Sequence, residues 1–197
     1  AAVYGEPAAI PVSETDQKHP LNPYGRSKLA AEEIIAAELV GSRVDFASFR
    51  FSNVFGPRQN AEGEGGVVAV FCNQLAHDVA PVIDGDGTQT RDFIFVGDVV
   101  NAIHMALTSD AELREGGGLG PAYNISTGVP TSIDDLGRLL RPHAGFYGEF
   151  TYGPPREGDI RDSALEPSKA RDVFAWDARV PLDVGLAQTY RWFANRP

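Results

Sequence analysis

The segment NPYGRSK, residues 22–28, combines a helix start with two chemically active side chains. Asn22 can accept a hydrogen bond from a free N–H group of the first helical turn, and Pro23 suits the first helical position, where no N–H is needed. We predict a helix that begins here and stops at Gly41. Tyr24 and Lys28 are four residues apart, so this helix places both side chains on one face.

Segments that favour strands alternate with segments that favour helices along the rest of the chain. Strands are predicted at residues 44–51, 93–96 and 122–125, and residues 1–5 have the pattern of the end of a buried strand. Helices are predicted at residues 67–77, at 131–140 behind a Thr131 or Ser132 cap, and at 183–193. A further helix begins with Asp98 as its cap, and its Val99, Ile103, Ala106 and Leu107 share one apolar face. Residues 6–22 and 53–66 are predicted loops, with a turn at 85–87 and a glycine-rich break at 116–121. This alternation predicts an α/β fold with a largely parallel sheet.

The composition excludes several classes of protein. The chain of 197 residues carries 17 Lys and Arg against 27 Asp and Glu, a net charge of −10, which argues against broad nucleic-acid binding. Its longest apolar run, residues 67–72, is too short to span a membrane. The single cysteine, Cys72, cannot form an internal disulfide, so a cytoplasmic location is expected. The four histidines show no metal-ligand spacing, and no metal site is predicted.

The Tyr24–Lys28 pair suggests proton transfer. A phenol with a pKa of about 10 is a poor base near neutrality, and a nearby ammonium group lowers that pKa by favouring the phenolate. Such a tyrosine could take the proton of a sugar hydroxyl while hydride leaves the same carbon. The alternative is a helix with an exposed tyrosine and lysine that have no chemical role.

Several motifs, in order along the chain, carry a resemblance to a known family. They are AAVYG (1–5), NPYGRSK (22–28), RFSNVFGPRQ (50–59), DGDGTQTRDFI (84–94), YNI (123–125), REGD (156–159) and SKA (168–170). Together they resemble the extended short-chain dehydrogenase/reductases, and within them the NAD-dependent nucleotide-sugar epimerases and dehydratases. The resemblance implies the carboxy-terminal part of a Rossmann-like parallel sheet plus a smaller α/β substrate-binding domain. Residues 1–56 would be the remnant of the dinucleotide-binding domain, residues 57–90 and 109–197 mainly the substrate domain, and residues 91–108 a return to the Rossmann part.

The resemblance also implies roles for individual residues. Tyr24 would be the catalytic base, and Lys28 and Phe51 would join it in binding NAD. Asn53 would bind the sugar or its phosphate, Arg91 and Arg156 the diphosphate, and Asp159 the ribose hydroxyls. Gly66 and Val67 open a helix whose free N–H groups also favour the diphosphate. Ser163 would leave room for an N-acetyl group. The alternative for the arginines is ordinary ion pairing with Asp86, Asp92 or Asp162.

The same resemblance suggests the reaction. Ala1 and Ala2 stand where sugar dehydratases carry an acidic pair, so elimination is disfavoured and 4-epimerisation of a UDP-sugar through a 4-keto intermediate is favoured. UDP-glucose, UDP-galactose and N-acetylated forms are the expected substrates; a 4-ketoreductase or 4,6-dehydratase, or a non-catalytic sugar-nucleotide binding fragment, are the alternatives. The family's glycine-rich NAD fingerprint and a catalytic Ser or Thr would lie before residue 1, so this chain is expected to be an incomplete, inactive portion. The intact protein is expected to be a homodimer, or to include a separate amino-terminal fragment, without nucleic-acid or membrane partners.

Overall fold

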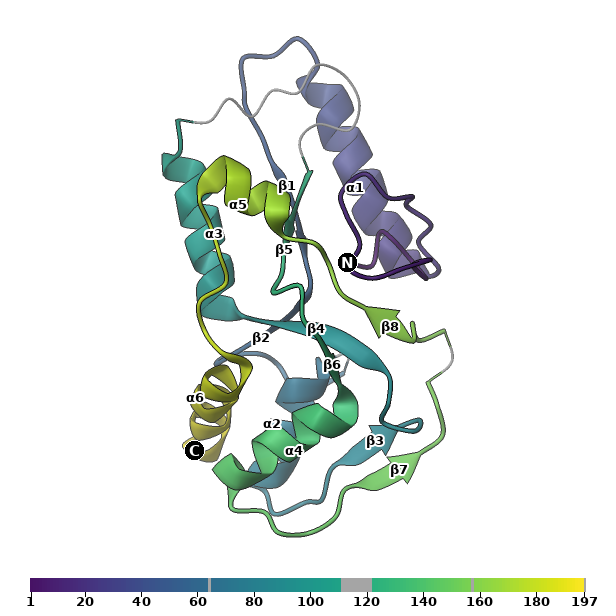
Figure 1. Ribbon diagram of the computed structural model, residues 1–197, viewed down its shortest axis with the longest axis vertical. Helices are drawn as coiled ribbons and strands as arrows, with labels where there is room; N and C mark the ends of the chain where they lie inside the picture. Colours follow the sequence, from purple (N-terminus) through teal and green to yellow (C-terminus); the bar gives the residue numbers. More distant parts are fainter. Residues whose placement is uncertain (64, 111–121, 157, 197) are drawn as a thin grey trace.

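The computed structural model describes residues 1–63, 65–110, 122–156 and 158–196 (Figure 1). The helices are α1 (Pro23–Leu39), α2 (Val67–Ala76), α3 (Val96–Thr108), α4 (Ile133–Ala144), α5 (Ser168–Phe174) and α6 (Leu182–Ala194). The strands are β1 (Ser48–Phe51), β2 (Asn53–Phe55), β3 (Val82–Asp84), β4 (Thr90–Phe95), β5 (Ala122–Ile125), β6 (Pro130–Ser132), β7 (Thr151–Gly153) and β8 (Asp162–Ser163).

Strand β4 connects the two halves of the elongated molecule (Figure 1). The first half contains α1, α3 and α5 around the parallel pair β1–β5, and the second contains α2, α4 and α6 with the parallel pair β3–β7. Between them, β4 pairs in parallel with β2 and β8 and antiparallel with β6. The predicted α/β fold with a largely parallel sheet is therefore confirmed.

Each half has its own apolar core. In the second half, Phe71, Leu136 and Leu186 are among the buried residues through which α2, α4 and α6 pack together. In the first half, Ile94, Ile125 and Trp176 belong to a second cluster that joins β4, β5 and the segment after α5. None of the helices in the described ranges is both long and apolar enough to cross a membrane.

The helix starts were predicted well because local signals set them. The side chain of Asn22 accepts a hydrogen bond from the Gly25 N–H at 2.8 Å, and Pro23 is the first residue of α1. Ser132 caps α4 in the same way, accepting from the Asp135 N–H at 3.0 Å. The helix predicted at residues 67–77 is α2, and the one at residues 183–193 is α6.

Other predictions were wrong where tertiary contacts decide the conformation. Residues 1–5 form a turn and not a strand, although Val3 and Tyr4 are buried. Residues 53–55, predicted as loop, form β2 because they pair with β4. The strand predicted at residues 44–51 is confined to Ser48–Phe51, the residues that pair with β5.

Helix α3 differs most from its prediction. It begins at Val96, with Phe95 at the cap position, so Asp98 is inside the first turn. The Asp98 carboxylate instead accepts a hydrogen bond from the Val180 N–H at 3.0 Å. The core-facing residues of α3 include Val99 and Ala102, whereas Ile103 and Leu107 are exposed. The break predicted at residues 116–121 lies outside the described residues.

Candidate functional site

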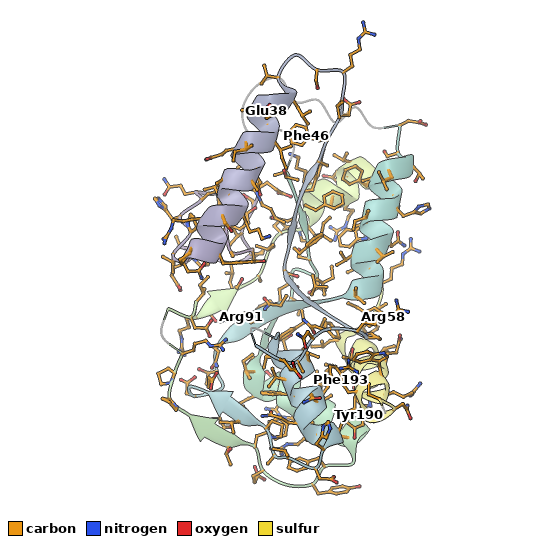
Figure 2. The ribbon with its side chains drawn as sticks, turned by 180° about the vertical axis from the view of Figure 1, so that it is seen from behind. Glu38, Phe46, Arg58, Arg91, Tyr190 and Phe193 are labelled. Carbon is orange, nitrogen blue, oxygen red and sulfur yellow. The ribbon has the colours of Figure 1, made fainter. Side chains whose placement is uncertain are left out.

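A cleft of about 480 Å³ opens between the start of α2, strands β3 and β4, and the loop before β8. Most residues predicted to bind a nucleotide sugar line it: Asn53, Gly66, Val67, Arg91, Arg156 and Asp159. They come from separate parts of the chain, which the pairing of β4 with β2 and β8 brings together. Figure 2 shows Arg91 at the boundary between the two halves of the molecule. We call this cavity the ligand cleft.

The guanidinium group of Arg91 is held in place from several sides. Its Nη2 donates to Oδ1 of Asp159 at 2.5 Å, and its Nη1 donates to the carbonyl oxygens of Thr90 at 2.7 Å and Arg161 at 3.2 Å. The ion-pair partner of Arg91 is therefore Asp159, and not Asp86, Asp92 or Asp162. Because the Arg91 side chain is only 11% exposed, its charge is presented to the cleft in a fixed position.

The N-terminus of helix α2 lies at the ligand cleft. Its cap residue, Gly66, has no side chain to bond the N–H groups of the first turn, and both Gly66 and Val67 line the cleft. A Cβ atom at Gly66 would lie 2.8 Å from Nε2 of Gln59, whose amide donates to the Val54 carbonyl at 3.0 Å. A side chain at position 66 would thus displace the Gln59 amide, and with glycine there the free N–H groups can meet an anion.

A second hollow of about 460 Å³ lies next to the ligand cleft. The two share Asp84, Gln89, Arg156 and Asp159, and the second one is completed by the Gly85–Asp86 turn and by Gly153, Pro155, Ile160 and Arg161. Arg156 is exposed at their common boundary. The combined space suits an elongated ligand with a negative charge near its middle.

Tyr24 and Lys28 line a different cavity, of about 500 Å³, together with Phe51. The Nζ atom of Lys28 lies 5.2 Å from the centre of the Tyr24 ring, so the structure places the two side chains side by side on α1. Tyr24 is 58% exposed, and its hydroxyl is accessible to a molecule in this cavity. We call it the Tyr24 cavity.

The two cavities are lined by neighbouring residues of the β1–β2 segment. Phe51, Ser52 and Val54 line the Tyr24 cavity, whereas Asn53 lines the ligand cleft. Ser163 lines neither; it pairs in register with Arg91, one strand away from the cleft.

Sequence reasoning missed a buried polar network that attaches α1 to β1. Arg50 donates to both carboxylate oxygens of Glu32, at 2.9 and 2.6 Å, and to the Tyr4 hydroxyl at 2.9 Å. Tyr4 in turn donates to Oδ1 of Asn124 at 2.7 Å, and burial raises the pKa of Tyr4 to about 12. A charged residue between two phenylalanines of a predicted strand was the available signal, since such a residue needs a buried partner.

A second missed residue is Asp92, which was considered only as an ion-pair partner. It is fully buried, and its carboxylate accepts hydrogen bonds from Ser52, Thr127, Gly128 and Leu165 instead of from an arginine. Burial raises the pKa of Asp92, whereas the hydrogen bonds from Thr127, Gly128 and Leu165 act in the opposite direction. Its surroundings therefore provide N–H and O–H donors in place of a cation.

Comparisons with known proteins match this geometry. The sequence profile of the NAD dependent epimerase/dehydratase family matches residues 1–126. A UDP-glucose 4-epimerase from Mycolicibacterium smegmatis is 39% identical over 197 residues, which cover 99% of this chain and 60% of that protein. A crystal structure of UDP-glucose 4-epimerase with UDP-glucose from Thermotoga maritima is similar at 36% identity, with a TM-score of 0.89 over 98% of this chain and 60% of that one.

A second similar structure is that of an enzyme named for an acetamido sugar. It is a UDP-N-acetylglucosamine 4-epimerase from Methanobrevibacter ruminantium in complex with UDP-N-acetylmuramic acid, at 28% identity and a TM-score of 0.89, again over 98% of this chain and 60% of that chain. The chain thus spans about 60% of the length of these relatives. Because the family profile covers well over half of its residues, the chain belongs to the NAD dependent epimerase/dehydratase family.

Proposed function

We propose that this chain supplies the substrate site and the Tyr–Lys pair of an NAD-dependent UDP-sugar 4-epimerase. The observation that carries the proposal is the arrangement of the two cavities. Asn53, Arg91 and Asp159 line the ligand cleft, and the Tyr24 cavity begins at the neighbouring residues of the same β1–β2 segment. The Mycolicibacterium smegmatis relative and the Thermotoga maritima structure, which match nearly the whole chain, are both UDP-glucose 4-epimerases.

In the proposed reaction, the chain's residues bind the diphosphosugar and move one proton. The guanidinium groups of Arg91 and Arg156 and the N–H groups at the start of α2 bind the diphosphate. Asn53 orients the sugar so that its C4 hydroxyl meets Tyr24, and Tyr24 accepts the hydroxyl proton and later returns it. The positive charge of Lys28 stabilises the phenolate form that this transfer requires.

NAD fits the Tyr24 cavity chemically, because Lys28 presents a donor for ribose hydroxyls beside an aromatic and partly apolar wall that includes Phe51. When bound there, NAD supplies the oxidation of the C4 alcohol and its reversal. Turning of the 4-keto sugar between the two steps exchanges the configuration at C4. Residues 1–56 and 91–108 would serve the cofactor side in this scheme, and residues 57–90 and 109–197 mainly the substrate side.

Two finer assignments belong to the same proposal. The small Ser163, beside Arg91 in the sheet, leaves the active enzyme able to accept N-acetylated sugars, and the intact enzyme is a homodimer. The first is tested by turnover of UDP-N-acetylglucosamine next to UDP-glucose, and the second by mass measurement in solution. Normal turnover of UDP-glucose with none of the acetamido sugar would refute the substrate assignment.

Binding is tested by calorimetry of UDP-glucose with the 197-residue chain. Arg91→Gln should weaken binding by at least about tenfold, because a charge-assisted hydrogen bond is lost. Arg138→Gln is the matched control, since Arg138 is an exposed arginine on α4 that pairs with Asp135 and lies outside the cleft. Equal affinities for the two variants would refute the assignment of the ligand cleft.

Catalysis is tested with the full-length gene product that contains this sequence. Tyr24→Phe should abolish epimerisation of UDP-glucose while leaving its affinity within about twofold, because the ring remains and only the proton acceptor is lost. Product analysis separates an epimerase, which yields UDP-galactose, from a ketoreductase or dehydratase. Sustained turnover by Tyr24→Phe would refute the proposed base.

A further inference from the structure

The buried carboxylate of Asp92 contacts residues close to Asn53 and to Ser163, two of the proposed substrate residues. Asp92 itself follows Arg91 on β4, and its Oδ1 accepts a hydrogen bond from the Ser52 hydroxyl at 3.3 Å. Ser52 directly precedes Asn53. The Oδ2 atom accepts from the Leu165 N–H at 3.4 Å, two residues beyond Ser163. One side chain therefore links the segments of Asn53, Arg91 and Ser163.

The same carboxylate also binds the loop that follows β5. The N–H and hydroxyl of Thr127 donate to Oδ1 at 3.0 and 2.7 Å, and the Gly128 N–H donates to Oδ2 at 2.9 Å. This loop carries none of the residues assigned to the substrate. The Thr127 hydroxyl is therefore a useful comparison for the Ser52 hydroxyl, because both donate to Oδ1 and only Ser52 adjoins a residue assigned to the substrate.

The position of Ser52 in the sheet indicates what its hydrogen bond to Asp92 holds in place. Strand β1 pairs with β5 up to Phe51, and β2 pairs with β4 from Asn53 onwards, so Ser52 lies where the chain changes partner strands. The backbone N–H of Ser52 is bound to the Ile125 carbonyl at 3.1 Å, on the β5 side. Its hydroxyl is bound to Asp92, on the β4 side. This hydroxyl thus fixes the start of β2, and with it Asn53, relative to Arg91.

All these partners are donors, which explains why the residue is an aspartate. A neutral amide in its place would turn an NH₂ group toward N–H groups and leave buried donors without an acceptor. An ionised carboxylate offers about four lone-pair sites to these donors and carries no hydrogen of its own.

We propose that Asp92 is a positioning residue for UDP-sugar binding, acting through the Ser52 hydroxyl to hold Asn53 in position relative to Arg91. This inference rests on the proposed function, because Asn53 and Arg91 are assigned to the substrate there. Asp92 does not touch the ligand cleft, so its effect reaches the substrate only through these neighbours.

The test compares Ser52→Ala with Thr127→Val in the 197-residue chain. Each variant removes one hydroxyl donor from Oδ1 of Asp92, and Thr127→Val also removes the acceptor of the Val129 N–H. Thermal denaturation measures stability, and calorimetry with UDP-glucose measures affinity. We expect Ser52→Ala to raise the dissociation constant about fivefold. Thr127→Val, which loses the shorter bond, should lower the melting temperature at least as much and change the dissociation constant by less than about twofold.

Thr127→Val is thus expected to lose at least as much thermal stability as Ser52→Ala, whereas Ser52→Ala is expected to lose more affinity for UDP-glucose. A purely structural role for Asp92 predicts affinity losses in proportion to the losses of stability, and that result would overturn the inference. Ser52→Cys, which keeps the size of the side chain and a weak donor, replaces Ser52→Ala if the latter does not fold, with the same expected order. A wild-type chain that folds but does not bind UDP-glucose would instead overturn the proposed function, which makes the two failures distinguishable.

Discussion

Glu32→Gln should destabilise the protein far more than the loss of one exposed charge would. In the native structure the two carboxylate oxygens of Glu32 receive Nε and Nη2 of Arg50, and the Arg50 side chain is 2% exposed. The substitution keeps the size of the side chain but turns an NH₂ group toward the guanidinium. Arg50 is then left as a buried cation without a counter-charge.

The size of the effect follows from this burial. Breaking a buried ion pair by removing one partner costs about 3–5 kcal/mol, because the remaining charge stays desolvated. Glu32 is 12% exposed, so some water reaches the pair, and the lower end of the range applies. We expect the free energy of unfolding to fall by about 3 kcal/mol.

Urea unfolding monitored by circular dichroism measures this loss. The matched control is Glu33→Gln, the next residue of α1, which is exposed and should change the unfolding free energy by less than about 0.5 kcal/mol. The double variant Glu32→Leu with Arg50→Met removes both charges and should be more stable than Glu32→Gln alone. A loss below about 1 kcal/mol in Glu32→Gln, or no recovery in the double variant, would refute the reasoning.

Three further outcomes are expected. Burial gives Tyr4 a folded-state pKa of about 12 against an ordinary value of 10, so the unfolded state loses its proton first as pH rises. The unfolding free energy should therefore fall by at most about 3 kcal/mol between pH 10 and 12, and Tyr4→Phe should flatten this dependence in denaturant titrations. Burial raises the pKa of the Cys72 thiol to about 12. A thiol reagent at pH 8 should therefore modify Cys72 only as fast as the protein unfolds, and rapid modification would contradict the burial of this thiol. Gly5 has a φ of +70°, and a Cβ there would lie 1.9 Å from the His19 carbonyl oxygen, so Gly5→Ala should cost at least about 2 kcal/mol in urea unfolding.

The fold could be predicted where short-range signals determine it. Asn22 and Pro23 fix the start of α1 through contacts within one helical turn, and Ser132 does the same for α4. Strands β3 and β7 could not be found, because each has three residues, too few to show an alternating pattern. They exist because they pair with each other across more than sixty residues of sequence.

For Asp98, the preference of aspartate for the start of a helix held, but the predicted cap position was wrong. Aspartate favours helix caps, and the residue does lie in the first turn of α3, but its carboxylate is engaged by the Val180 N–H. This contact spans 82 residues, and no local pattern contains it. The apolar face of α3 was misjudged for the same reason, because the neighbours of the helix decide which side is buried.

The candidate site was likewise predicted from the sequence only in part. The family motifs identified Asn53, Arg91 and Asp159, and the structure brings them to one cleft. The partner of Arg91 was not predicted from the sequence, which offered Asp86, Asp92 and Asp162 as partners and assigned Asp159 to the ribose hydroxyls. Only the pairing of β4 with β8 brings residues 91 and 159 together.

The fixed guanidinium of Arg91 has a thermodynamic consequence. A free arginine loses rotamer freedom worth up to about 2 kcal/mol when it is immobilised. Arg91 has already lost this freedom on folding, because Thr90, Asp159 and Arg161 hold it before any ligand arrives. An anion that meets Arg91 therefore avoids an entropic penalty equivalent to at most about a thirtyfold change in affinity.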